Sequence, residues 1–465
     1  MGVHFCRPQR CAIFSVLLLF LSISHTAAHG YTSNSNSVSC ARVSEGEPAL
    51  TVDWSKASFC SENAVEHKRE SPRVEDIYRP SCNKSSHSLQ RVVGYYETWT
   101  IRRRCNVFWP ERIPPGVYTH INVAYAVIDP GTFEVRPSLL ADINLFTRLT
   151  DLKRSDPDLK VFIALGGSMY SSPGPTEHTF TDLAASEANQ TAFIKSLTKF
   201  MTAFDFDGVD LDWQYPGTEN RGGRPQDFAN FPRFLKNLKA ALSQTGGRDG
   251  LSITLPSSYQ YLQHYDIQRI RNHVDFFNVM TRDLHGTYRK GEAWNDESLN
   301  AHTNLTEIQD SLDLLWQYDI SPQQVVLGMA FYGRTFQLTD PSCNTPGCPF
   351  ASGGEAQRCS YEVGVLMNSE IDDIVARNNL TPILDSNAAV KMATWDNQWL
   401  AYDDVDTFQL KADFARSQCL GGLMVWAVSH DHASGAYSQA LKTAARRKFV
   451  ALANDATVDD TILPT

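Results

Sequence analysis

The sequence predicts an α/β protein: a (β/α)₈ TIM barrel with a small α+β insertion subdomain before the last strand. Two observations predict the barrel. Eight short, mostly apolar runs recur along the chain, and stretches with a helical period lie between them. Near-continuous apolar strands are typical of a parallel sheet buried on both faces. Strands and helices that alternate eight times favour closure of that sheet into a barrel.

We expect the eight strands at the runs VVGYY from Val92, HINVAYAVI from His120, VFIALGG from Val161, FDGVDLDW from Phe206, LSITL from Leu251, DFFNVMT from Asp275, VVLGMAF from Val325 and LGGLMVWA from Leu420. Residues 189–204 and 228–242 repeat apolar side chains every three to four positions, which predicts two of the intervening helices. Within residues 336–390 this rhythm breaks, and three cysteines and several turn residues appear. We therefore place the insertion there, inside a barrel domain that spans residues 81–449.

Both ends of the chain are predicted to lie outside the barrel. Residues 1–28 combine early arginines, a short apolar run and small residues up to Ala28, as signal peptides do. The apolar run is short for a bilayer span, and a retained anchor is the alternative. Residues 29–80 are polar and lack periodicity, which predicts a poorly structured leader, and residues 450–465 form a polar tail. We expect a secreted, extracellular protein, free or associated with a cell wall.

The cysteines fit an exported protein. Eight remain after the signal peptide, and in an oxidising compartment an even number favours disulfides over a thiol nucleophile or a metal site. No C-x-x-C pair is present, which weakens a zinc interpretation further. Eight cysteines allow roughly 100 pairings, so the connectivity stays open, with Cys40–Cys60 as one candidate in the leader. We expect no metal and no cofactor. Glycosylation sequons predict glycans on exposed loops at Asn83, Asn189, Asn304 and Asn379.

The charge of the chain limits its partners. The net charge is −10, and no long basic run offers a footprint for phosphates, so a nucleic-acid partner is excluded. The short run Arg102, Arg103 and Arg104 is the exception, and we interpret it as a solvated loop. No second apolar stretch of spanning length follows the first, so we expect no membrane partner.

Residues 207–216, which read DGVDLDWQYP, carry the chemistry. Side chains alternate along a strand, so Asp210, Asp212 and Gln214 should point into the barrel. Carboxylates inside a barrel are costly unless they are paired or hydrogen-bonded. At the carboxyl end of a barrel strand the usual reason for them is catalysis. A satisfied polar plug is the alternative.

This segment resembles the signature D-G-x-D-x-D-x-E-Y-P of glycoside hydrolase family 18, with Gln214 where the family has glutamate. Further stretches from Arg91 to about His432, among them RVVGYYETW, FYGRTFQL and GGLMVWAVS, are similar to secreted fungal chitinases of the class V type. The resemblance implies retaining hydrolysis of β-1,4-linked N-acetylglucosamine, in which the acetamide of the substrate is the nucleophile.

The resemblance also implies roles for individual positions. The residue matching Asp212 orients the acetamide, the glutamate at position 214 protonates the leaving oxygen, and Trp426 forms the floor of the pocket. The catalytic positions are therefore Asp210, Asp212 and Gln214, the last one degenerate. The expected substrate-binding residues are Trp99, Gly166, Gly167, Ser168, Tyr215, Met280, Thr281, Arg282, Asp283 and Trp426.

The chain departs from the family where the chemistry is concentrated. The Gln214 amide has two N–H donors but no transferable proton near neutral pH. General acid catalysis is worth about 10² to 10⁴ in rate. Arg282 stands where the family has a tyrosine that donates to the acetyl carbonyl, and Ser168 stands where many relatives have tryptophan. Arg282 could also fill the acetamide pocket by pairing with Asp212.

We hypothesise that the changes at Gln214 and Arg282 belong together. Losing a carboxylate and gaining a cation both reduce the negative charge among four aspartates of this region. These aspartates are Asp207, Asp210, Asp212 and Asp283.

Three functions remain open. The first is a secreted chitinase-like protein, inactive or severely impaired, that binds chitin or chitooligosaccharides. The second is an active chitinase that uses another acid. The third is a barrel that binds another protein, although no motif identifies such a partner. Whether the chain is an enzyme stays open at this stage.

Overall fold

The computed structural model describes residues 77–287 and 298–448. The expected signal peptide, almost all of the leader with Cys40 and Cys60, and the tail at 450–465 lie outside the described residues. All of the described residues belong to one compact unit. Within this part of the chain, no helix is long and apolar enough to cross a membrane.

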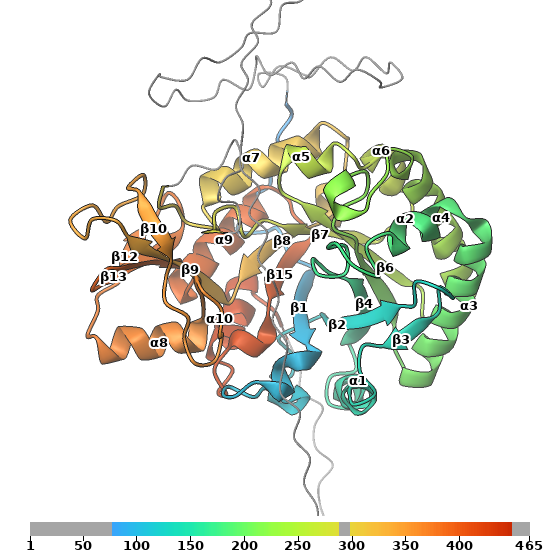
Figure 1. The fold of residues 1–465 in the computed structure, drawn as a ribbon, viewed down its shortest axis with the longest axis horizontal. Helices are drawn as coiled ribbons and strands as arrows, with labels where there is room; N and C mark the ends of the chain where they lie inside the picture. Colours follow the sequence, from blue (N-terminus) through green and yellow to red (C-terminus); the bar gives the residue numbers. More distant parts are fainter. Residues whose placement is uncertain (1–76, 288–297, 449–465) are drawn as a thin grey trace, which may run out of the picture. The chain divides into compact units, whose positions relative to one another are not determined.

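The predicted (β/α)₈ barrel is confirmed (Figure 1). Its strands are β1 (Arg91–Glu97), β2 (His120–Ile128), β4 (Lys160–Gly166), β5 (Gly208–Asp212), β6 (Gly250–Pro256), β7 (Phe276–Met280), β8 (Val325–Ala330) and β15 (Gly422–Trp426). Each one falls on one of the eight apolar runs. All eight pair in parallel with their neighbours, and the pairing of β1 with both β15 and β2 closes the sheet. The short β3 (Val135–Pro137) adds an antiparallel edge to β2.

Helices cover the outside of the barrel. They are α1 (Asp142–Asp151), α2 (Thr179–Ala185), α3 (Glu187–Phe204), α4 (Asp227–Leu242), α5 (Tyr259–Leu262), α6 (Ile267–Ile270), α7 (Leu305–Trp316), α9 (Val405–Ser417) and α10 (Ala436–Ala445). Both predicted helices appear, as α3 and α4. The turn from α3 to β5 positions the chemical segment. Ser186 caps the first turn of α3 by accepting a hydrogen bond from the Asn189 backbone N–H, and Asp205 ends the helix in the left-handed conformation.

Alternation along the strands creates two apolar layers. Tyr96 of β1 points outward and packs with the core between sheet and helices, whereas Tyr95 points into the barrel. Phe162 and Phe276 fill the interior together with Tyr95. These side chains fill the interior of the barrel. The polar residues of β5 therefore lie next to a packed apolar layer and do not line a channel.

The insertion is an antiparallel sheet with one helix. It comprises β9 (Tyr332–Leu338), β10 (Phe350–Gly353), β11 (Val365–Met367), α8 (Asn368–Arg377), β12 (Ile383–Asp385), β13 (Val390–Trp395) and β14 (Gln398–Tyr402). The order β10-β9-β14-β13-β12, with β11 on β9, lies beside the barrel (Figure 1). The sheet extends past both ends of the expected range 336–390, because β9 follows β8 after one residue and β14 runs back along β9.

Six cysteines of the described residues form three disulfides: Cys82–Cys419, Cys105–Cys359 and Cys343–Cys348. The second one joins the loop after the 3₁₀ helix η3 (Thr98–Arg102) to the insertion. No group of three or more potential metal ligands occurs among residues 77–287 and 298–448.

The four sequons fall into two kinds of environment. Asn83 and Asn379 are exposed. Asn189 lies in α3 and Asn304 caps α7 through its side chain, so these two are not on open loops as expected.

Candidate active site

The innermost residue of the site is Asp210, which is fully buried at the centre of the barrel. Its Oδ2 accepts a hydrogen bond from the Tyr95 hydroxyl at 2.7 Å. Its Oδ1 accepts from the Ser252 hydroxyl at 2.6 Å and from the Asn278 amide at 3.1 Å. Burial raises the pKa of Asp210 to about 6, although these hydrogen bonds oppose the shift. The side chain is a satisfied polar anchor below the mouth of the barrel.

Asp212 ends β5 and faces the mouth with 3% of its surface exposed. The Tyr125 hydroxyl donates to Oδ2 at 2.8 Å, and the Thr254 hydroxyl donates to Oδ1 at 2.7 Å. The Gln214 side-chain N–H also donates to Oδ1, at 2.8 Å. As predicted from alternation, Asp210, Asp212 and Gln214 therefore share the inner face of the barrel.

The Gln214 amide is held by its bond to Asp212 and by a weaker contact of 3.7 Å to the Met280 sulfur. Its backbone is held as well, because the Arg221 guanidinium donates to the Gln214 carbonyl at 3.2 Å. Arg221 also donates to the carbonyl and hydroxyl of Ser168 at 2.8 and 2.9 Å. Ser168 is exposed at the rim, so the loop after β4 and the segment after β5 are tied together by one cation.

Two glycines are required where β4 meets Asp212. A Cβ on Gly166 would lie 2.2 Å from the Asp212 carbonyl oxygen, and φ there is +111°. A Cβ on Gly167 would lie 2.8 Å from the Tyr125 ring. The Gly167 N–H donates to the Asp212 carbonyl at 2.8 Å. Both glycines thus support the site through the backbone.

Arg282 does not pair with Asp212, contrary to one of our expectations. It donates to Asp283 at 2.8 Å and to the Tyr332 hydroxyl at 3.2 Å, and its guanidinium lies 5.1 Å from the centre of the Trp426 ring. Arg334 also binds Asp283, at 2.6 and 3.0 Å. Burial favours the neutral acid, but the contacts with Arg334 and Arg282 outweigh it and hold the pKa of Asp283 well below its usual range.

Asp207 was expected to share its charge with this site, and the structure corrects that. It precedes β5 at the opposite end of the barrel, where it forms an ion pair with Lys153 at 3.2 Å. Its carboxylate also accepts a hydrogen bond from the Val161 backbone N–H. The physical reason is that Asp207 lies just before the amino end of β5, whereas Gln214 lies beyond its carboxyl end.

The remaining predicted residues lie in three different surroundings. Trp99 and Trp426 meet Tyr125 in an aromatic cluster, with ring centres 6.1 to 6.4 Å apart. Thr281 is buried, and its hydroxyl donates to the Gly328 carbonyl. Tyr215 stacks on Tyr261 at 4.1 Å.

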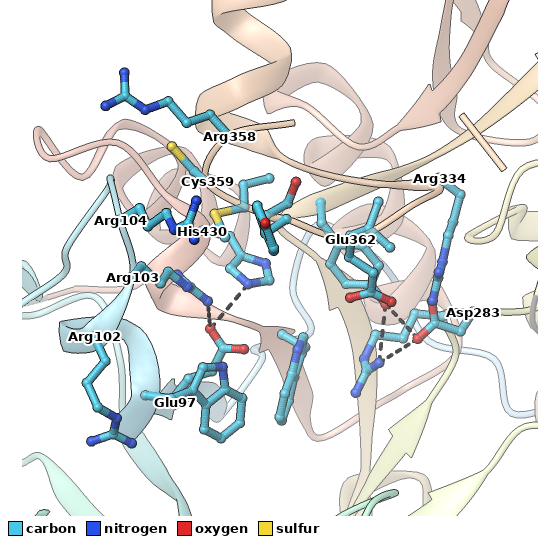
Figure 2. Close-up of a pocket in the computed structure, with 18 residues that line it drawn as sticks. Glu97, Arg102, Arg103, Arg104, Asp283, Arg334, Arg358, Cys359, Glu362 and His430 are labelled. Atoms are coloured by element: carbon cyan, nitrogen blue, oxygen red, sulfur yellow. Dashed lines mark hydrogen bonds and ion pairs between the residues drawn. The ribbon is translucent and has the colours of Figure 1, made fainter. Parts of the chain in front are cut away.

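A pocket of about 380 Å³ lies between the carboxyl ends of β1 and β15 and the insertion (Figure 2). Arg282, Asp283, Trp99 and Trp426 are among its lining residues, whereas Asp212 and Gln214 are not. The other lining residues are Glu97, Arg102, Arg103, Arg104, Tyr332, Arg334, Arg358, Cys359, Ser360, Tyr361, Glu362, Val365, Met367 and His430.

Sequence reasoning missed the buried ion pair at the end of β1. Glu97 pairs with Arg103 and with His430, the latter at 3.2 Å. Burial favours the neutral acid, but His430 and Arg103 outweigh it and lower the pKa of Glu97 to about 2. The solvated-loop interpretation of the arginine run is therefore wrong for Arg103, whose side chain is 9% exposed. The run of three consecutive arginines, Arg102 to Arg104, was the sequence feature that could have indicated this ion pair.

Comparisons with known proteins agree with this geometry. The family model for glycosyl hydrolases family 18 matches residues 91–431. Chitotriosidase-1 of Mus musculus is 30% identical over 75% of this chain and 75% of its own. The probable chitinase LysM11 of Penicillium expansum is 28% identical over 72% of this chain, which spans 32% of that protein.

Solved structures give the same result. Catalytic domain 2 of the Group II chitinase of Ostrinia furnacalis superposes with a TM-score of 0.68 at 26% identity, covering 77% of this chain and 97% of that domain. A mutant of the same domain in complex with (NAG)₅ has a TM-score of 0.69 at 26% identity, covering 78% and 97%. The chain belongs to the glycosyl hydrolases of family 18.

Proposed function

We propose that this chain is a secreted chitinase-like protein that binds chitin or chitooligosaccharides and hydrolyses them poorly or not at all. One observation carries the proposal: the side chain above Asp212 is an amide, and its N–H donates to the Asp212 carboxylate. An amide in this place can hydrogen-bond a glycosidic oxygen but cannot give it a proton.

Three carboxylates near the site, those of Glu97, Asp283 and Asp210, are poorly suited to replace the acid. A general acid works best with a pKa near the operating pH and within hydrogen-bond reach of the leaving group. Glu97, with a pKa of about 2, and Asp283, with its lowered pKa, stay ionised. Asp210 has the pKa of a candidate, about 6, but its surface is fully buried beneath Asp212. These features disfavour the alternative of an active chitinase.

Binding is supported by the surfaces that remain. The cluster of Trp99, Tyr125 and Trp426 carries aromatic faces of the kind on which pyranose rings stack, although the Arg282 guanidinium lies over one face of Trp426. Because Arg282 is engaged by Asp283, the Asp212 carboxylate is not masked by a cation. The related Ostrinia furnacalis domain was solved with (NAG)₅ bound.

An extracellular location fits this role. Three disulfides tie the described residues together, and disulfides persist in oxidising compartments. One similar protein, 28% identical over 72% of this chain, which spans 23% of that protein, is the secreted chitinase LysM12 of Penicillium expansum.

The test combines calorimetric titration with tetra-N-acetylchitotetraose and a fluorogenic hydrolysis assay on the same preparation. We expect binding without turnover, and we expect Trp426→Ala to weaken binding at least tenfold, as loss of a stacking platform would. The control is Trp109→Ala, since Trp109 is a tryptophan, exposed at 38%, that does not line the pocket. Ordinary turnover would contradict the proposal. If the protein neither binds nor hydrolyses the tetramer, the result would favour a barrel that binds another protein.

A further inference from the structure

The pocket beside Trp426 is strongly cationic on an acidic protein. The chain carries a net charge of −10. Yet among the described residues six arginines and three carboxylates line this one cavity, and Asp142 beside it pairs with Arg102, which leaves a formal charge of +2 (six minus four) before His430 is considered. Like charges gathered around a cavity repel one another, so such a surplus favours an anionic occupant.

Most of the cations already have partners. Glu97 neutralises Arg103, and Asp283 is shared by Arg282 and Arg334. The Arg282 Nε is buried and makes no hydrogen bond with the described residues.

Arg104 and Arg358 also line the pocket. Arg104 and Arg358 are exposed and form no ion pair with any residue in 77–287 or 298–448. Arg104 instead lies over the Tyr361 ring at 4.8 Å.

A disulfide places these two arginines on one wall. Arg104 precedes Cys105 and Arg358 precedes Cys359, and the Cα atoms of the bonded cysteines are 5.2 Å apart. Figure 2 shows Arg358, Cys359, Arg104 and Arg103 along one side of the pocket and Arg334 with Asp283 along the other. The cations are therefore arranged around the cavity and do not merely share a surface.

We propose that this pocket binds the anionic substituent of an acidic saccharide, a sugar that carries a sulfate or a carboxylate. Guanidinium groups recognise both oxyanions through paired N–H donors. Trp99 and Trp426 line the same cavity and provide the apolar faces that a sugar ring contacts. This inference rests on the proposed saccharide binding and names the class of saccharide more closely.

The experiment titrates the full-length protein with N-acetylglucosamine 6-sulfate, glucuronic acid, neutral N-acetylglucosamine and inorganic sulfate. We expect at least one acidic sugar to bind ten times or more tightly than the neutral sugar and than sulfate alone. We also expect this preference to shrink at high salt. The sulfated and the carboxylated sugar distinguish the two sources of charge.

The variant Arg104→Gln/Arg358→Gln should weaken binding of the preferred acidic sugar about tenfold or more, as expected for lost hydrogen bonds to a charged group. The matched control is Arg136→Gln/Arg154→Gln, which removes two exposed arginines that do not line the pocket. It should leave the affinity unchanged.

Equal affinities for acidic and neutral sugars would overturn the inference. It would also be overturned if both double variants bound the acidic sugar as tightly as the wild type, or if both lost affinity to the same extent. Inorganic sulfate binding as tightly as the sugars would overturn it too. A parallel titration of the wild-type protein with neutral chitotetraose reports on the proposed function separately, because this ligand should bind whether or not acidic sugars are preferred.

Discussion

Restoring the family's residues at two positions should restore catalysis in steps. In Gln214→Glu, the new carboxyl would lie near the Asp212 oxygen that now accepts from the amide at 2.8 Å. Two carboxyls this close share a proton, which raises one pKa toward the range of a general acid. Regaining that acid is worth about 10² to 10⁴ in rate.

The single revertant should nevertheless remain slow, because Arg282 still replaces the hydroxyl that the family uses to hold the acetamide. The structure changes the reason for expecting this coupling. Arg282 forms an ion pair with Asp283, so its positive charge does not compensate the charge of Asp212. What is missing is a positioned donor, and one such hydrogen bond in the transition state is worth about 1.5–3 kcal/mol, or roughly 10- to 150-fold. Adding Arg282→Tyr should therefore raise kcat over Gln214→Glu alone by this factor.

The assay is the steady-state hydrolysis of a fluorogenic chitobioside by the two single variants and the double variant. The control is Arg282→Tyr with Gln214 intact, which should stay inactive because no acid is present. Activity in Gln214→Glu alone equal to that of the double variant would refute the coupling. Activity in Arg282→Tyr alone would refute the role that we assign to the amide.

Three further predictions concern stability. Removing the long-range disulfide with Cys105→Ser/Cys359→Ser should lower the free energy of unfolding by about 2–5 kcal/mol in denaturant titrations, and a loss below about 1 kcal/mol would contradict its structural role. Gly166→Ala should cost at least about 2 kcal/mol more than Gly246→Ala, because both glycines have positive φ but only the first would meet a backbone oxygen at 2.2 Å; equal costs would contradict the clash. Asp210 binds a proton in the folded state up to about pH 6, whereas the unfolded chain releases it near pH 4, so its contribution to stability falls as pH rises through this window, by up to about 3 kcal/mol. Asp210→Asn should flatten that slope, and an unchanged slope would contradict the assignment.

The sequence predicted the features that depend on local pattern. The eight strands follow from apolar runs, and the shared inward direction of Asp210, Asp212 and Gln214 follows from the alternation of side chains. Both are properties of a single strand, so no knowledge of distant residues is needed.

Features that depend on distant partners could not be predicted. Arg103 reads as a loop residue until Ser429 and His430, more than 300 positions away, surround its partner Glu97. Arg282 could have paired with Asp212 or with Asp283, and only the packing of Tyr332 and Arg334 from the insertion decides between them. The disulfide pairing is long-range in the same sense, since spacing alone left roughly 100 arrangements open.

The most direct measurement of the central claim follows tetra-N-acetylchitotetraose by mass spectrometry while it is incubated with a stoichiometric amount of the wild-type protein. Our account predicts that the tetramer is bound and recovered intact, because Gln214 has no proton to transfer. Rapid conversion to dimers, abolished by Asp212→Asn and retained in Trp109→Ala, would contradict it.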